Sequence, residues 1–184
     1  MALGCMLFCT NSDASKNRLV DPKTPAGGVP VGYKLVFSDE FNGHEIDRTK
    51  WNIGINKQNI QNNGVQCVYT WKNVLLREGQ LVFVQQREDS PVSGKVYGPE
   101  KNAEFNYTSG GMNTGGKFEL TNNMYVELRV KLPSNSGGYA AFWGMAGKKG
   151  APPEDRMELD WFEYIADQKK ARFWSGLWFS KYAG

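Results

Sequence analysis

Three acidic residues in one short segment, Glu158, Asp160 and Glu163, have a spacing that could support acid–base chemistry. Glu158 and Asp160 are two residues apart, so on a β-strand both side chains leave the same face. Glu163 would point away by strict alternation, but one bulge residue, at Trp161 or Phe162, returns it to the face of the other acids. The segment therefore predicts a bulged strand with three carboxyl groups on one face.

An ordinary solvated strand face is the simplest alternative to a reactive site. Two observations argue against it. No Lys or Arg occurs from Met157 through Asp167, so the like charges would repel each other without compensation. The residues between and around the acids are strongly apolar, which indicates a central strand. Grouping acids there is unfavourable unless their repulsion is used to shift pKa values.

Retaining glycosidases use such a pair of carboxyl groups, about 5–5.5 Å apart, one ionised and one protonated. Neighbouring carboxylates share one proton because two adjacent charges are unfavourable. Four pleat steps of about 3.3 Å place the outer Cα atoms about 13 Å apart, so the strand must curve and the side chains must lean inward. The sequence holds one histidine, His44, which excludes a histidine-rich zinc site and leaves acid–base chemistry to carboxylates.

The bulk composition is that of one globular domain of 184 residues with a net charge of +3. No basic run interleaved with aromatics indicates nucleic acid, and no stretch of about 18 apolar residues indicates a membrane span. We expect no cofactor, although a structural calcium ion is compatible with the acids, and we expect a monomer. Three cysteines, two of them near the N-terminus, do not indicate a disulfide framework.

The N-terminal residues 1–30 are predicted to be a signal or lipoprotein-like remnant followed by a linker. The first nine residues are apolar, and the run from Ala2 to Cys5 resembles the small-residue pattern before a lipid-attachment cysteine. Cys5 or Cys9 could then carry a lipid anchor, which predicts a protein that is either secreted or held at the outer cell surface as a lipoprotein. A frayed terminus with chance hydrophobes is the alternative.

The rest of the chain, 31–184, has short β-rich runs separated by Gly, Asn, Pro and Ser, which predicts an all-β sandwich whose ordered part begins at Tyr33. Strands are expected at Tyr33–Phe37, Val65–Thr70, Leu81–Gln86, Gly116–Leu120, Tyr125–Leu132, Tyr139–Trp143, Met157–Tyr164 and Arg172–Phe179. No segment shows a helical apolar period over three turns.

The acidic strand resembles the E-x-D-x-x-E signature of family 16 glycoside hydrolases, in the bulged form of laminarinases, agarases and carrageenases. Other blocks match in order: Leu35–Gly43, Ile46–Asp47, Lys50–Asn52, Gln66, Tyr69, Asn73, Glu78–Leu81, Thr108–Thr114, Tyr125–Pro133 and Ala141–Trp143. The resemblance covers about residues 33–180. It implies a concanavalin A-like jelly roll, of which 31–184 would be a partial catalytic domain lacking C-terminal strands, so that poor solubility or no turnover is expected.

The resemblance implies that Glu158 is the nucleophile, Glu163 the general acid/base and Asp160 a helper. The residues expected to contact substrate are Trp143, Arg129, Trp161 and Trp178. The implied function is a retaining endo-glycoside hydrolase acting on a β-linked polysaccharide, either a β-1,3-glucan or a marine galactan. A non-catalytic carbohydrate-binding sandwich is the alternative, and a calcium-stabilised structural sandwich is a third.

Three positions depart from the family pattern. A histidine is usual near Trp178, an arginine is common in laminarinases at Gly111, and a glutamate is usual at Val65. The first departure changes the surroundings of the acids, and the others leave the choice between glucan and galactan open. The Asp39–Phe41 segment is expected to be structural rather than catalytic.

Overall fold

The structure, a computed structural model, describes residues 2–10, 30–54, 60–61, 67–96, 102–146, 156–167 and 170–179. The chain divides into two compact units, 1–131 and 132–184. Nearly all regular structure in the described residues is β, and the helical exception among them is the 3-10 turn η1 (Trp71–Asn73). The all-β prediction is confirmed, while the jelly-roll topology stays a prediction. None of the described helical segments is long and apolar enough to cross a membrane.

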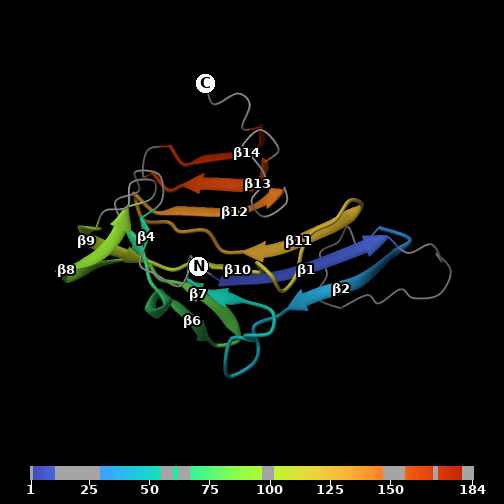
Figure 1. The fold of residues 1–184 in the computed structure, drawn as a ribbon, viewed down its shortest axis with the longest axis horizontal. Helices are drawn as coiled ribbons and strands as arrows, with labels where there is room; N and C mark the ends of the chain where they lie inside the picture. The colour runs from blue at the N-terminus through green and yellow to red at the C-terminus, as the bar shows by residue number, and fades with distance from the viewer. Residues whose placement is uncertain are drawn as a thin grey trace. The chain divides into compact units, whose positions relative to one another are not determined.

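The largest sheet of the first unit is built around β1 (Ala2–Thr10), as Figure 1 shows. β1 pairs antiparallel with β11 (Met124–Val130), with β2 (Tyr33–Asp39) and, near its start, with β7 (Gln80–Phe83). β6 (Val74–Arg77) pairs with β7. This pairing differs from the expectation that strands begin only after the N-terminal linker. The signal-like origin and lipid anchoring of the same residues stay predictions.

The remaining strands of the first unit form two smaller groups. They are β3 (Asn52–Ile53), β4 (Ile60–Gln61), β5 (Val68–Tyr69), β8 (Gln86–Val96), β9 (Asn102–Ser109) and β10 (Met112–Asn113). β4, β5, β9 and β8 close into a ring of paired strands, and β3 pairs with β10. The strand predicted at Gly116–Leu120 is wrong. The backbone turns there instead, because Gly116 adopts a positive φ of 72° and the N–H groups of Lys117 and Phe118 donate to Thr114.

An aromatic cluster forms part of the core of the first unit and explains the Asp39–Phe41 segment. Phe37 packs edge-on against Trp51 with ring centroids 5.4 Å apart, and Phe41 lies 5.8 Å from the same ring. The Asp39 carboxylate accepts hydrogen bonds from the Phe41 N–H at 2.9 Å and from the Trp51 indole at 2.8 Å. These bonds hold Phe41 at its unusual positive φ of 55°, so Asp39 has the structural role that was predicted.

The second unit is a three-stranded antiparallel sheet in the order β12 (Tyr139–Ala146), β13 (Met157–Ile165) and β14 (Arg172–Phe179). The acidic segment is therefore the central strand of this sheet, as its apolar neighbours predicted. Backbone hydrogen bonds from Gly137 to Ala166 (2.9 Å) and from Ala166 to Gly138 (2.7 Å) secure the end of the β12–β13 pair. Hydrogen bonding on both sides fixes the backbone that carries the three acids.

Candidate active site

A bulge in β13 brings the three acids together. Against β14, Asp160 lies opposite Gly176 and Glu163 lies opposite Trp174, so three steps on β13 match two on β14. The register against β12 shifts at the same place. The extra residue lies in the 161–162 stretch, and the predicted bulge is confirmed.

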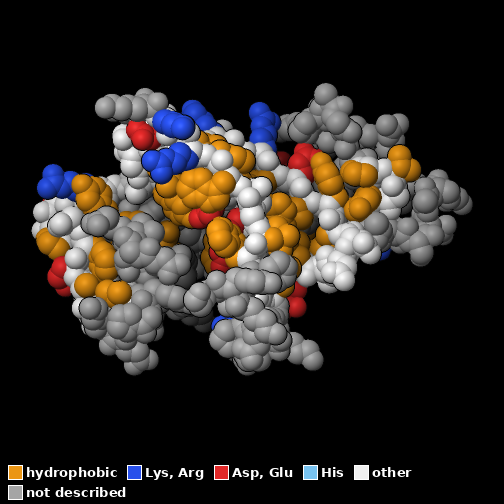
Figure 2. Space-filling view, turned by 90° about the horizontal axis from the view of Figure 1, so that it is seen from above, with side chains coloured by type: hydrophobic (Ala, Val, Ile, Leu, Met, Phe, Trp, Pro, Cys, Tyr) orange, Lys and Arg blue, Asp and Glu red, His pale blue; other side chains and the backbone are white. Residues whose placement is uncertain are grey.

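The sheet face that carries the acids can be defined from strand register, because residues directly opposite each other in an antiparallel pair share a face. This acidic face consists of Ala141, Trp143 and Met145 from β12, Glu158, Asp160 and Glu163 from β13, and Trp174, Gly176 and Trp178 from β14. Three carboxyl groups are thus bordered by aromatic and aliphatic side chains. In Figure 2, acidic side chains likewise appear as small patches among hydrophobic ones.

Asp160 is the most enclosed of the three acids, with 3% of its surface exposed. The Trp178 indole N–H donates to its Oδ2 at 2.6 Å. Burial raises the pKa of Asp160; the bond from Trp178 opposes this, and the charge of Glu163 adds to it. In place of the histidine that the family 16 resemblance implies, Trp178 supplies a donor that does not titrate.

Glu163 is held by donors from both neighbouring strands. The Tyr139 hydroxyl of β12 donates to Oε1 at 2.5 Å, and the Trp174 indole of β14 donates to Oε2. Both carboxyl oxygens therefore have a fixed direction, which is the kind of preorganisation that a positioned acid or base requires.

Glu158 lies beside Met145 and Trp178 and is half-buried. Burial raises its pKa, and the charges of Asp160 and Glu163 raise it further. This electrostatic coupling agrees with the register in placing all three carboxyl groups close together. A carboxyl group with a raised pKa ionises at a higher pH than an ordinary glutamate, so protonation at this face changes nearer to neutral pH.

The comparisons with known proteins agree with this chemistry. The chain is similar to glucan endo-1,3-beta-glucosidase A1 of Niallia circulans, with 29% identity over 138 residues, covering 71% of this chain and 20% of that protein. It thus spans about a fifth of the length of that relative. The similarity supports a relationship to glycoside hydrolases. No protein-family description and no solved structure matches the chain.

The four residues predicted to contact substrate are distributed over both units. Trp143 and Trp178 lie on the acidic face and are 45% and 57% exposed. Trp161 instead packs on Phe142, with ring centroids 4.9 Å apart, and Phe142 precedes Trp143 on β12 and so points to the opposite face. Arg129 is exposed on β11, in the first unit. Contact of these residues with substrate stays a prediction.

Two residues of the site, Tyr139 and Trp174, were not predicted from the sequence. A usable signal was present for Trp174, because it lies four residues from Trp178 and residues at even spacing on a strand share a face. Tyr139 has the same spacing from Trp143 on β12, but its contact with Glu163 depends on the β12–β13 register, which the sequence does not give. Among the described residues, no group of three or more His, Cys, Asp or Glu side chains is placed to hold a metal ion.

Proposed function

We propose that this chain carries the catalytic strand of a retaining endo-β-glycanase that cleaves a β-linked polysaccharide. The observation that supports the proposal most is the bulged central strand with three coupled carboxyl groups on a face lined by tryptophans. The similarity to a glucan endo-1,3-beta-glucosidase favours a β-1,3-glucan over a galactan as the substrate.

In the proposed mechanism, the Glu158 carboxylate attacks the anomeric carbon while the Glu163 carboxylic acid protonates the glycosidic oxygen. The bond to the leaving saccharide breaks, and a covalent glycosyl–enzyme ester forms on Glu158. Glu163, now ionised, removes a proton from water, which attacks the anomeric carbon and releases Glu158. Two displacements at one carbon restore the original configuration, so the β-anomer is the first product.

The supporting side chains divide this work between them. Tyr139 and Trp174 aim the carboxyl group of Glu163. Its proton belongs on Oε1, because the Tyr139 hydroxyl can turn to accept a hydrogen bond whereas the Trp174 indole can only donate. Trp178 holds Asp160 beside Glu158 and opposes the rise in the pKa of Asp160, so it favours a negative helper next to the nucleophile. The exposed ring of Trp143 offers an apolar surface on which the C–H face of a sugar can pack.

Release of reducing ends from laminarin, agarose, porphyran and carrageenan tests the proposal. Cleavage of laminarin that is lost in the Glu158→Ala form, with the β-anomer detected first by NMR, would support the mechanism and would contradict the poor turnover expected of a partial domain. Cleavage that survives the substitution, or an α-anomer as first product, would contradict the mechanism. Binding without cleavage by both forms would support the non-catalytic carbohydrate-binding alternative.

A further inference from the structure

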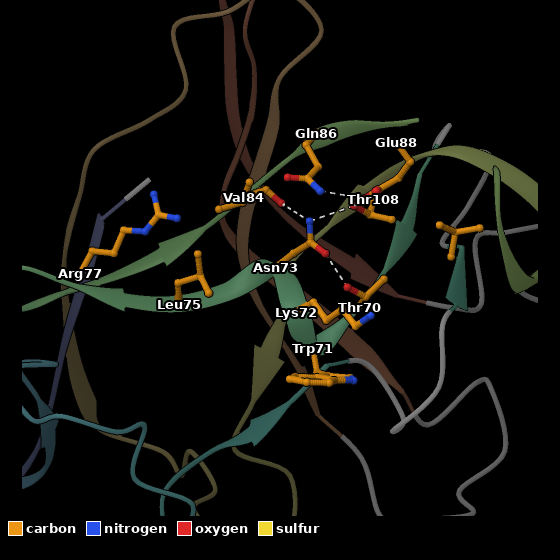
Figure 3. Close-up of a pocket in the computed structure, with 11 residues that line it drawn as sticks. Thr70, Trp71, Lys72, Asn73, Leu75, Arg77, Val84, Gln86, Glu88 and Thr108 are labelled. Atoms are coloured by element: carbon orange, nitrogen blue, oxygen red, sulfur yellow. Dashed lines mark hydrogen bonds between the residues drawn. The ribbon is translucent and has the colours of Figure 1, made fainter. Parts of the chain in front are cut away.

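A second feature, separate from the acidic face, is a pocket of about 290 Å³ in the first unit. Its lining comes from η1, β6, β8 and β9 and from residues next to them, all within 1–131 (Figure 3). Pockets for small molecules usually occupy about 300–1,000 Å³. The volume of this pocket lies at the lower end of that range.

The indole of Trp71 at this pocket is 64% exposed although its backbone is firmly anchored. Asn73, two residues further along η1, is buried and donates to the Val84 carbonyl at 3.0 Å and to the Thr108 hydroxyl at 2.9 Å. The Thr70 hydroxyl donates to the Asn73 side chain from the other side of η1. An exposed indole on an anchored backbone can stack on the apolar surface of a ligand.

The polar part of the pocket is centred on Glu88. Thr108 and Gln86 both donate to its Oε1, so Oε2 can accept hydrogen bonds from a ligand. The hydrogen bond from Thr108, then that from Gln86, and the charge of Lys72 lower the pKa of Glu88. Trp71 and Glu88 both line the pocket, and Figure 3 shows them at opposite ends of it, with Asn73 and Thr70 between them.

The chemistry of this lining matches a neutral sugar. A pyranose ring has apolar C–H faces, which pack on an indole, and a rim of hydroxyl groups, which donate to carboxylates and accept from ammonium groups. Beside this one carboxylate the lining holds two cations, Lys72 and Arg77, so it offers hydrogen-bond donors as well as an acceptor to hydroxyl groups.

The geometry points to a second saccharide-binding site in which a neutral sugar chain stacks one hexopyranose ring on Trp71 and places hydroxyl groups on Lys72 and Glu88. The identity of the sugar, as part of the β-glucan cleaved at the acidic face, rests on the proposed function. The existence of the site does not depend on that function. Such a site holds the polymer to the protein and raises the effective concentration of its other segments.

Affinity electrophoresis in gels that contain laminarin tests the site in the Glu158→Gln form of the full chain, which should bind the polymer without degrading it. We expect Trp71→Ala to weaken retardation by laminarin about tenfold and Trp71→Phe to weaken it less. Tyr107→Ala is the matched control, because Tyr107 is also an exposed aromatic residue of the first unit, lies outside the pocket lining and should leave retardation unchanged. Thermal melting of each variant checks that it folds.

Several outcomes would overturn the site. One is that laminarin retards Trp71→Ala as strongly as its parent, or that Tyr107→Ala loses as much retardation as Trp71→Ala. Another is that laminarin does not retard the parent, or that carrageenan retards it more strongly than laminarin. Failure of the proposed enzyme is a different result, namely that the unsubstituted chain releases no reducing ends while retardation by laminarin still depends on Trp71.

Discussion

The acidic face and the Trp71 pocket each combine exposed tryptophan with carboxyl groups, and the pKa values of these carboxyl groups are shifted in opposite directions. On the acidic face, burial raises the pKa values of Glu158 and Asp160, and neighbouring acids raise them further. At the Trp71 pocket, hydrogen bonds from Thr108 and Gln86 lower the pKa of Glu88.

The difference separates a site suited to reaction from one suited to recognition. Crowded carboxyl groups near an apolar surface exchange protons at a pH where a general acid and a nucleophile can coexist. A single carboxylate that already accepts two hydrogen bonds keeps its charge and serves as a fixed acceptor for ligand hydroxyls. The same residue types therefore predict different functions once their neighbours are known.

Substitution of Glu158 should have the largest effect on the acidic face. Glu158→Gln keeps the shape but removes the oxygen anion of the proposed nucleophile, so hydrolysis of laminarin should fall by more than about 10⁴-fold. Retardation by laminarin should persist. Glu119→Gln, at an exposed position of the first unit, is the control and should keep full activity. A Glu158→Gln form that still turns over within tenfold of the parent would remove Glu158 from the chemistry.

Glu163→Gln should have a somewhat smaller effect that depends on the leaving group. Loss of a general acid costs about 10²–10⁴-fold on an ordinary glycosidic bond. On an aryl glycoside, whose leaving group needs no proton, the rate of glycosyl–enzyme formation should fall far less. Added azide, which needs no base to attack, should speed the release of the glycosyl group from the enzyme. Comparison of the two substrates measures this role, and an equal loss on both would argue against it.

Trp178 should affect catalysis through Asp160. Trp178→Phe removes a hydrogen bond to a charged group, which is worth about 1.5–3 kcal/mol, so kcat should fall roughly 10- to 100-fold. It also removes the bond that opposes the rise in the pKa of Asp160, so the acidic limb of the rate profile should move to higher pH. Trp178→His, which restores a donor, should recover part of the rate. An unchanged pH profile in Trp178→Phe would mean that the indole only packs.

The sequence was most informative where the constraint is local. The bulge followed from the spacing of Glu158, Asp160 and Glu163, since only an extra residue puts all three acids on one face. The bounds of β14, at Arg172 and Phe179, also agree with the predicted strand. Such features depend on residues adjacent in the chain, and strand alternation is enough to predict them.

Features that depend on distant pairing were missed. β8 has little apolar alternation because most of its residues are exposed. The predicted strand Leu81–Gln86 reaches only the first residue of β8. The apolar N-terminus is compatible with a signal-like segment and with a strand, and composition does not separate the two. The contacts of Tyr139 with Glu163 and of Trp71 with its pocket each depend on elements far apart in the sequence.

The smallest expected effect is also the most direct measure of the contrast between the two sites. The pKa of Glu158 is raised in the folded protein, so its charged form opposes folding at neutral pH. The folded protein is relatively more stable below the unfolded pKa, about 4.3, and loses that stability as the pH rises through the folded pKa. Glu158→Gln should therefore raise the melting temperature at pH 7, and the gain should vanish below about pH 4.

Glu88 has the opposite sign. Its lowered pKa stabilises the folded protein above the unfolded pKa, and this contribution disappears as the pH falls through the folded value. Glu88→Gln should lower the melting temperature at pH 7 and converge with the parent in acid. Melting curves of both variants from pH 3 to pH 8 measure the two differences side by side. Shifts of the same sign at pH 7 would mean that the two carboxylates do not experience opposite surroundings, and the division into a reactive and a recognising site would lose its electrostatic basis.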